Sequence, residues 1–294
     1  MAITTQLEEL ITQVESAEGL DPLARGARAV GSKILGGPRT KDVLSGRAIG
    51  HPLHPGLTLV AGGSLLGATI LDVVGGPSAR DAARRLVGAG LLAALPTALA
   101  GVSDWLDTEG AESRIGTVHA ASNLLAVAAY SHSWRRRGRG HSGLVSGLLG
   151  AMALTAGGWL GGHLTFAQGV GVDTTAFGSG PADWTDLAAS PDITESLKCF
   201  EVGGEQLLAT RVRDEVVVIA NRCTHRGAPL SDGERVGECV TCPWHRSVFA
   251  LQGGAVLRGP ASRPQPAYEV READGRIQIR RREVRSLRTN PAGG

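Results

Sequence analysis

Four long blocks without Asp, Glu, Lys or Arg dominate the middle of the chain, at 55–71, 86–103, 115–134 and 142–162. A helix needs about 20 apolar residues to cross the hydrocarbon core of a bilayer. One such block is also compatible with a buried core helix. Four in succession, separated by charged loops, predict a bundle of four transmembrane helices.

The first 50 residues have the periodicity of two short amphipathic helices. The second of these carries Arg25, Arg28 and Lys33 opposite an apolar face. Such a helix lies on a membrane surface or packs against the rest of the protein. The sequence leaves both placements open for this amphipathic segment, 1–50.

The pattern changes after the fourth block. Residues 166–195 contain several Gly and Pro and almost no periodicity, which is typical of a linker. From residue 196, short β-branched runs such as EVVVIA and RIQIRR are separated by Gly and Asp turns. We therefore expect a multi-domain chain: a four-helix transmembrane domain over 51–165, a small all-β domain over 196–288 and a disordered tail at 289–294.

The composition agrees with helices packed in lipid. The chain has 42 Gly and only 4% aromatic residues, and small residues let helix backbones approach each other in membranes. A net charge of +2 gives no indication of nucleic-acid binding. Four cysteines are too few for a disulfide scaffold in 294 residues. The N-terminus is acidic and amphipathic, so we expect no signal peptide.

Two short motifs in the β domain each combine a cysteine with a histidine. Cys223 and His225 lie in CTHRGAPL, and Cys242 and His245 lie in CPWH. Zinc is one ion that such ligands suit, although zinc fingers pair Cys with Cys and His with His along the chain. One ligand of each kind on each turn suits a [2Fe–2S] cluster with two thiolates on one iron and two imidazoles on the other.

This region, over 196–283, resembles the Rieske [2Fe–2S] proteins. The likeness includes CTHRGAPL, CPWH, SVFALQGG and the loop GPASRPQP. It implies that Cys223 and Cys242 hold a buried iron. It also implies that His225 and His245 hold an outer iron near the surface, where a partner exchanges electrons.

Several positions place the domain with the ferredoxin-type branch. Ala228 and Trp244 stand where the bc-complex type has a disulfide. Ser247 is available to donate a hydrogen bond to sulfur, but Phe249 replaces the tyrosine of high-potential members. These features imply a potential in the lower part of the range of roughly −150 to +300 mV. Arg246 follows the second histidine, where the family usually has Gly.

The chain lacks the room for oxygen activation in the manner of a Rieske oxygenase. Only 49 residues follow His245, and none of them is histidine. A further mononuclear iron held by two histidines therefore has no place. We expect an electron-transfer component and assign no catalytic residues, and the sequence leaves its status as an enzyme open.

The helical half resembles a four-helix membrane family of uncharacterised function. The likeness rests on GHPLHP at 50–55 and on GWLGG at 158–162. Following the helices up and down brings His54, His119 and His163 to one membrane face. Ionisable groups in membrane segments are functional candidates by default.

Three interpretations of these histidines stay open. Two of the imidazoles would ligate haem b axially, as in membrane cytochromes. Alternatively, the histidines and Asp104 would form a quinone site that exchanges protons. The third interpretation is that they are interfacial residues hydrogen-bonded to backbone or headgroups.

The arginine distribution indicates an orientation in the cell (inner) membrane. Under the positive-inside rule, loops rich in arginine lie in the cytoplasm. The loops opposite the three histidines hold Arg80, Arg84, Arg85, Arg135, Arg136, Arg137 and Arg139. This favours an extracytoplasmic β domain, whereas Arg39, Lys41 and Arg47 beside the first helix argue against it. Sidedness stays open.

Together these patterns predict a membrane-bound one-electron relay between a partner oxidoreductase or dehydrogenase and the quinone pool. Its expected cofactors are a [2Fe–2S] cluster, with haem b and a quinone as candidates in the membrane. The alternatives are a membrane-anchored redox or iron sensor and an anchoring subunit of a larger complex. The sequence does not fix the oligomeric state or the direction of electron flow.

Overall fold

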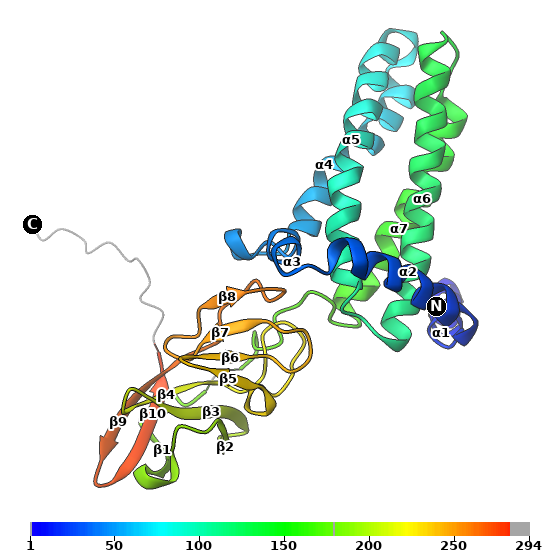
Figure 1. The fold of residues 1–294 in the computed structure, drawn as a ribbon. Coiled ribbons are helices and arrows are strands. Elements are labelled where there is room, and N and C mark those ends of the chain that lie inside the picture. The colour runs from blue at the N-terminus through cyan, green and yellow to red at the C-terminus, as the bar shows by residue number, and fades with distance from the viewer. Residues whose placement is uncertain (1, 179, 283–294) are drawn as a thin grey trace, which may run out of the picture. The chain divides into compact units, whose positions relative to one another are not determined.

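The computed structural model describes residues 2–178 and 180–282. The chain divides between Val172 and Asp173 into two compact units. The first is helical and the second is built of β-strands (Figure 1). Residues 283–294, including the expected tail at 289–294, lie outside the described part.

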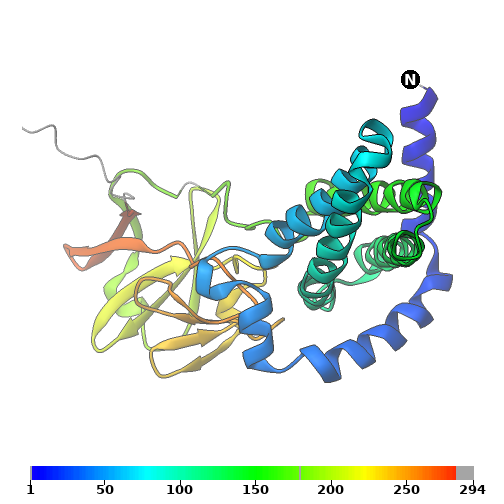
Figure 2. The same cartoon turned by 90° about the horizontal axis from the view of Figure 1, so that it is seen from above.

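Three helices, not two, precede the first long block: α1 (Ala2–Glu15), α2 (Asp21–Leu35) and α3 (Pro38–Leu44). The extra break falls at Gly36 and Gly37, directly before a proline that suits the first position of a helix. α1 contacts α6, and α2 contacts both α5 and α6. Figure 2 shows α1 and α2 outside the four long helices.

α2 packs on the bundle through its buried residues Ala24, Gly31 and Leu35, and Arg28 lies beside them. Arg28 donates a hydrogen bond to the backbone oxygen of Leu106 at 2.9 Å. Leu23, Val30 and Ile34 are all more than half exposed. These apolar side chains of α2 are therefore free to contact an apolar environment outside the helical unit, such as lipid.

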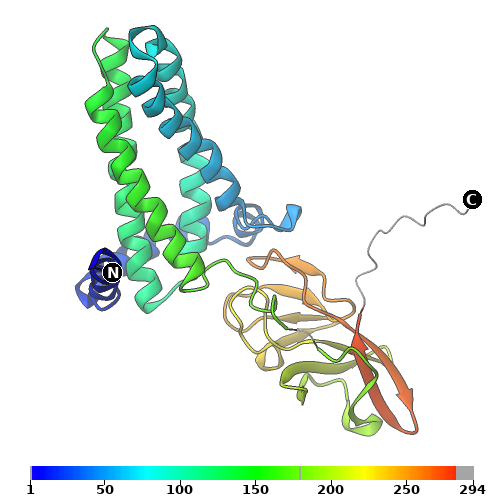
Figure 3. The same ribbon diagram turned by 180° about the vertical axis from the view of Figure 1, so that it is seen from behind.

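Four long helices form an antiparallel bundle (Figure 3): α4 (Leu53–Val74), α5 (Arg80–Trp105), α6 (Gly110–Gly138) and α7 (Leu144–Phe166). α4 and α6 each contact both α5 and α7. By length and composition, three helices could cross a membrane: Leu53–Val74, Gly76–Trp105 and Leu144–Phe166. α6 is as long but more polar, because His119, Asn123 and His132 lie along it. The predicted helical region is confirmed, with three apolar spans where four were expected.

Polar contacts join α4 to α6 within the bundle. Asp72 accepts a hydrogen bond from Nη1 of Arg137 at 2.6 Å, and both side chains are less than a tenth exposed. The hydroxyls of Thr69 and Tyr130 lie 2.8 Å apart. Because Asp72 and Arg137 face each other, neither is an isolated ion in an apolar interior.

The second unit is all-β, as predicted, with three antiparallel sheets (Figure 3). The first sheet is β1 (Thr185–Ala189), β10 (Arg276–Arg281) and β9 (Tyr268–Ala273). The second is β2 (Lys198–Val202), β3 (Glu205–Val212) and β4 (Glu215–Ala220). The third is β5 (Glu234–Val236), β6 (Cys239–Thr241), β7 (Val248–Ala250) and β8 (Val256–Arg258).

β1 lies inside the range expected to be linker. Its residues pair with β10, for example Thr185 with Ile279. The strand is short, and its partner is about 90 residues away, so its own sequence carries little β signal. The β fold thus begins before residue 196.

The second sheet, formed by β2, β3 and β4, separates two hydrophobic cores. Leu207 and Val218 face one core, whereas Leu208 and Ile219 face the other. This alternation is the period of two that a strand imposes on its side chains. The second of these cores also contains Phe249 and the two cysteines at 223 and 242, so both candidate ligand loops are anchored in packed interior.

Candidate metal centre and membrane histidines

The first candidate loop follows β4. The backbone N–H of Cys223 donates to the oxygen of Ala228 at 2.9 Å, and that of Gly227 donates back to Cys223 at 2.8 Å. Gly227 has a φ of +79°, in the left-handed region that favours glycine. These bonds close a tight loop that carries His225 at its tip.

The second loop, between β6 and β7, closes with the same pattern. Cys242 donates to the oxygen of Ser247 at 2.8 Å, and Arg246 donates back to Cys242 at 3.2 Å. Arg246 occupies the place that Gly227 has in the first loop, and its φ is +63°. A non-glycine residue therefore holds the left-handed conformation at this turn.

The two cysteine sulfurs interact inside the core. Both residues are 1% exposed. A hydrogen bond from Cys223 lowers the pKa of Cys242 to about 6, with the N–H groups of His245 and Trp244 also favouring the thiolate. The same bond, together with burial, raises the pKa of Cys223. The contact between the two sulfurs therefore favours the thiolate at Cys242 over that at Cys223.

The two histidines lie further out than the cysteines. The rings of His225 and His245 are half-buried, with centroids 5.1 Å apart and planes at 88°. The Nδ1 atom of His225 is buried. In the part of the chain that the structure describes, no three His, Cys, Asp or Glu side chains gather as around a single metal ion. A thiol pair inside and an imidazole pair outside fit the donor set of a Rieske cluster.

A third loop, Gly259–Pro266, is fastened to the first ligand loop. The amide of Gln265 donates to the oxygen of Ala220 at 2.9 Å and accepts from the N–H of Thr224 at 3.1 Å. The hydroxyl of Thr224 donates to the oxygen of Arg263 at 2.9 Å. The sequence motif includes Gln265, but only the fold reveals that this buried amide positions the ligand loop.

Thr174, just past the division between the units, is also bound to this ligand loop. Its hydroxyl donates to the oxygen of Cys223 at 2.7 Å, and its N–H donates to the oxygen of Thr224 at 3.2 Å. Nothing in the Gly-rich sequence around Thr174 indicates this contact.

The remaining residues singled out in the sequence lie as follows. Ser247 is buried, and its hydroxyl accepts from the N–H of Ala261 at 2.9 Å. Phe249 is fully buried in the core that contains both ligand cysteines. Cys199 is exposed and accepts a hydrogen bond from Asn221 at 3.2 Å, whereas Cys239 is half-buried in β6.

In the bundle, the structure brings His54 and His119 together. Their ring centroids are 6.4 Å apart. Nδ1 of His54 lies 2.9 Å from the oxygen of Thr97, and Nδ1 of His119 lies 2.7 Å from the oxygen of Gly157. A backbone oxygen can only accept, so each Nδ1 carries the proton and each Nε2 carries a lone pair. Asn123 lies 3.2 Å from Nε2 of His119 through its own donor nitrogen, which agrees with this tautomer.

Each of these histidines rests on a glycine of the neighbouring helix. A Cβ on Gly101 would lie 2.6 Å from Cε1 of His54, and one on Gly161 would lie 3.1 Å from Cε1 of His119. Each glycine comes four residues after the carbonyl that its histidine contacts. The hairpins α4–α5 and α6–α7 therefore present their histidines in the same way.

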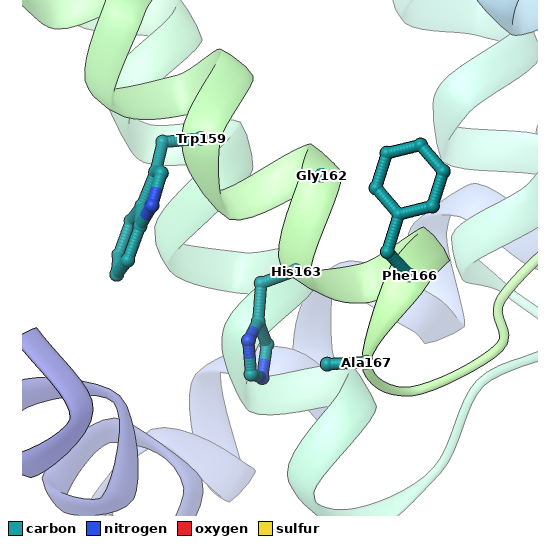
Figure 4. Close-up of a pocket in the computed structure, with 5 residues that line it drawn as sticks. All are labelled: Trp159, Gly162, His163, Phe166 and Ala167. Carbon is teal, nitrogen blue, oxygen red and sulfur yellow. The ribbon is translucent and has the colours of Figure 1, made fainter. Parts of the chain in front are cut away.

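His163 makes a different contact. Its Nε2 lies 3.0 Å from Oε1 of Glu15 on α1, and Gln168 donates to the same oxygen at 2.8 Å. His163 also borders a groove of about 400 Å³ with Trp159, Gly162, Phe166 and Ala167 (Figure 4). Asp104, the expected fourth member, lies at the end of α5, where Lys41 pairs with Asp107 at 2.8 Å. The role of Glu15 was not predicted, because it depends on where α1 packs.

Comparisons with known proteins agree with both halves. A Rieske [2Fe-2S] domain matches residues 183–269, and a predicted membrane protein family (DUF2231) matches 50–174. The anthranilate 1,2-dioxygenase ferredoxin subunit of Burkholderia cepacia is 31% identical over 99 residues, which are 33% of this chain and 92% of that protein. The naphthalene 1,2-dioxygenase ferredoxin component of Pseudomonas putida is 31% identical over 97 residues, 33% of this chain and 93% of that protein. The ferredoxin of carbazole 1,9a-dioxygenase from Nocardioides aromaticivorans IC177 is 26% identical, with 34% of this chain and all of that chain covered and a TM-score of 0.33.

Proposed function

This chain belongs to the Rieske [2Fe-2S] family through its C-terminal domain, and from that premise we propose that it is a membrane-bound one-electron relay between a partner oxidoreductase and the quinone pool. Its similarity to ferredoxin components supports an iron–sulfur electron-transfer role. The observation that carries the proposal is the sulfur pair inside and the imidazole pair outside, each drawn from the same two loops.

We assign Cys223 and Cys242 to the inner iron and His225 and His245 to the outer iron. A Rieske cluster takes up and releases one electron at a time. The low pKa of Cys242 and the N–H groups aimed at both sulfurs favour the thiolates that iron requires. The half-buried imidazoles then form the surface at which a redox partner docks. Because the relatives are named as ferredoxins of dioxygenase systems, an oxygenase component is one class of partner.

The helical unit anchors this domain in the cell membrane. We propose that α4 to α7 all cross the bilayer, with α6 shielded by its neighbours despite its polar residues. The exposed Leu23, Val30 and Ile34 would place α2 in the interfacial layer, with Ala24, Gly31 and Leu35 against the bundle. The arginine-rich loops would face the cytoplasm and the β domain the opposite side.

His54 and His119 are our candidate residues to hold haem b, which would supply a further one-electron carrier within the membrane. The ring spacing of 6.4 Å supports this assignment, and the amide of Asn123, 3.2 Å from Nε2 of His119, would have to move to release that nitrogen. The carbonyls of Thr97 and Gly157 would hold the rings in orientation, as outer contacts commonly do for metal-bound histidine.

The groove beside His163 is our candidate quinone site. Its lining is apolar and aromatic, apart from the imidazole, which contacts Glu15. An imidazole–carboxylate pair can supply and accept the protons that accompany quinone reduction. His163 thus has a different task from His54 and His119 in this scheme.

Metal and pigment analysis of the detergent-solubilised full chain tests the proposal. We expect two irons per chain in the cluster, a Rieske EPR signal after reduction, and a Soret band from haem b. Absence of the EPR signal in intact protein would contradict the relay. If the EPR signal is present but no quinone-dependent electron flow is seen, a redox sensor or an anchoring subunit becomes the better account.

A further inference from the structure

Every Asp, Glu, Lys or Arg side chain in the two ligand loops and the segment that follows them is an arginine. Residues 222–230 and 242–266 contain no Asp, Glu or Lys. Five arginines, which we call the arginine rim, lie in these stretches: Arg222, Arg226, Arg246, Arg258 and Arg263.

The fold gathers the arginine rim around the histidine pair. Arg226 and Arg246 directly follow His225 and His245 in the chain. Arg258 donates to the backbone oxygen of Arg246 at 3.1 Å. The other members belong to the same tip, because the backbone of Arg263 accepts from Thr224 and the guanidinium of Arg222 lies against Gly227. Three separate segments therefore contribute positive charge to one end of the domain.

Among the described residues, carboxylates also lie near the rim. Glu234 lies 3.5 Å from Arg246, and both side chains are more than 60% exposed. An exposed pair of this kind is weak and is screened by salt. Asp173 is close to the first ligand loop, but it accepts hydrogen bonds from the N–H and hydroxyl of Thr175 at 2.9 and 2.7 Å.

An exposed indole lies beside the outer histidine. Trp244 is 58% exposed, and its ring centroid is 6.4 Å from that of His245. Trp and Arg are the residues that most often dominate binding energy at protein interfaces. A large exposed apolar ring within a charged rim has the composition of a protein docking surface.

We propose that the arginine rim docks an acidic protein, namely a redox partner whose own electron-exchange surface is lined by Asp and Glu. The inference rests on the proposed function and specifies the chemistry of the partner. Opposite charges around the two exchange surfaces would steer encounter and orient the partner at the histidines. The exposed indole at the centre favours a protein over a lipid headgroup as the occupant.

The first test measures binding without electron transfer. The full chain in neutral phosphatidylcholine nanodiscs is titrated with a zinc-substituted acidic blue-copper protein and, separately, with a basic c-type cytochrome. The Debye length falls from about 30 Å at about 10 mM salt to about 8 Å at about 150 mM. We expect the acidic protein to bind at low salt and to bind at least tenfold more weakly at high salt. The basic protein should bind more weakly than the acidic one at low salt.

Charge-reversed variants locate the effect. Arg226→Glu with Arg246→Glu should weaken binding of the acidic protein at least tenfold at low salt. Arg213→Glu is the matched control, because Arg213 is 82% exposed in the turn at the opposite end of β4. A strand of six residues spans about 20 Å, so the control lies well away from the rim. The control should bind within about twofold of wild type.

A kinetic measurement gives an independent readout. With the copper form of the acidic protein, one electron leaves the dithionite-reduced chain and converts Cu(II) to Cu(I). The second-order rate constant should fall with salt and with the double variant, in parallel with affinity. The EPR signal of each variant confirms that the loss is not a loss of iron.

Three results overturn the inference. The first is an affinity for the acidic protein that does not change with salt or with the rim variants. The second is tighter binding of the basic protein than of the acidic protein. In the third, adding phosphatidylglycerol to the nanodiscs suppresses binding of the acidic protein, which would assign the rim to anionic lipid. Any of these with a normal EPR signal leaves the proposed function intact. An absent EPR signal in wild type contradicts the proposed function as well.

Discussion

Asp72 on α4 and Arg137 on α6 are paired inside the bundle, with side chains 7% and 5% exposed. They are the innermost charges at the end of the bundle away from His54 and His119. A charge in such a place is tolerated because its partner compensates for the loss of water. Their contact therefore links α4 and α6, which otherwise pack mainly against α5 and α7.

Removing one member of this pair should cost more than removing both. Arg137→Ala leaves a buried carboxylate and should lower the free energy of unfolding by about 3–5 kcal/mol. The double variant Asp72→Ala/Arg137→Ala should be more stable than Arg137→Ala alone. Unfolding in SDS is the measurement, and Arg136→Ala, which changes an exposed neighbour, is the control. Additive single and double effects would show that the pair does not act as a unit.

The four cysteines divide into two pairs with opposite expected effects. Cys223→Ser and Cys242→Ser should each abolish the EPR signal and bound iron, because each removes a thiolate from the buried pair. Cys199→Ser and Cys239→Ser should leave both unchanged. Iron analysis and EPR of the four purified variants check this. Retained signal in either of the first two would refute the ligand assignment.

The reduction potential should respond to hydroxyls near the sulfurs. Phe249→Tyr adds a hydroxyl within the core that holds both cysteines, and Ser247→Ala removes one. A hydrogen bond that favours the reduced state by about 1.4 kcal/mol raises a one-electron potential by about 60 mV. We expect Phe249→Tyr to raise the potential and Ser247→Ala to lower it by amounts of this order. EPR-monitored redox titration measures both, and shifts of the opposite sign would exclude hydroxyl donation to sulfur.

Glycine substitutions distinguish the two histidine environments from the rest of the bundle. Gly101→Ala would press a methyl group onto the ring of His54 and should remove or shift the Soret band. It should also cost about 1–3 kcal/mol by overpacking. Gly158→Ala is the control, since a Cβ there meets nothing within 4 Å, and it should be neutral or stabilising by up to about 1 kcal/mol. His163→Ala should keep the Soret band, and its loss in that variant would return His163 to the haem site.

Cys199 offers a probe of sidedness with a defined pH dependence. It is exposed, and it is not a proposed ligand. Partial burial raises the pKa of its thiol above the ordinary value. Because the thiolate is the reactive form, labelling by a membrane-impermeant maleimide should accelerate as pH rises through the alkaline range. If the reagent labels the wild-type protein in intact spheroplasts and does not label Cys199→Ser, the β domain lies outside the membrane. If labelling requires lysis, the β domain lies inside.

The sequence predicted the architecture because its hydrophobic pattern is strong. Long uncharged blocks predicted α4 to α7, and the change to short β-branched runs predicted the β domain. β1 was missed because its pairing with β10 joins segments far apart in the chain. The third helix before the bundle was missed because Gly36 and Gly37 break a segment whose amphipathic pattern continues across them.

The candidate site was predictable where its residues form a spaced motif, as at Cys223, Cys242 and their histidines. Gln265 and Thr174 carry no such motif, because their importance lies in long-range contacts with a loop backbone. Similarly, the sequence predicted three histidines at one membrane face, but it did not show which two of them lie next to each other. That distinction depends on α1, whose Glu15 contacts His163.

The matched hairpins have an architectural consequence. Each has a histidine in the first half of its first helix and a receiving glycine near the end of its second, so each hairpin itself supplies the contacts that seat one imidazole. A Cβ on one of these two glycines would therefore disturb the imidazole of its own hairpin and leave the glycine contact of the other histidine in place.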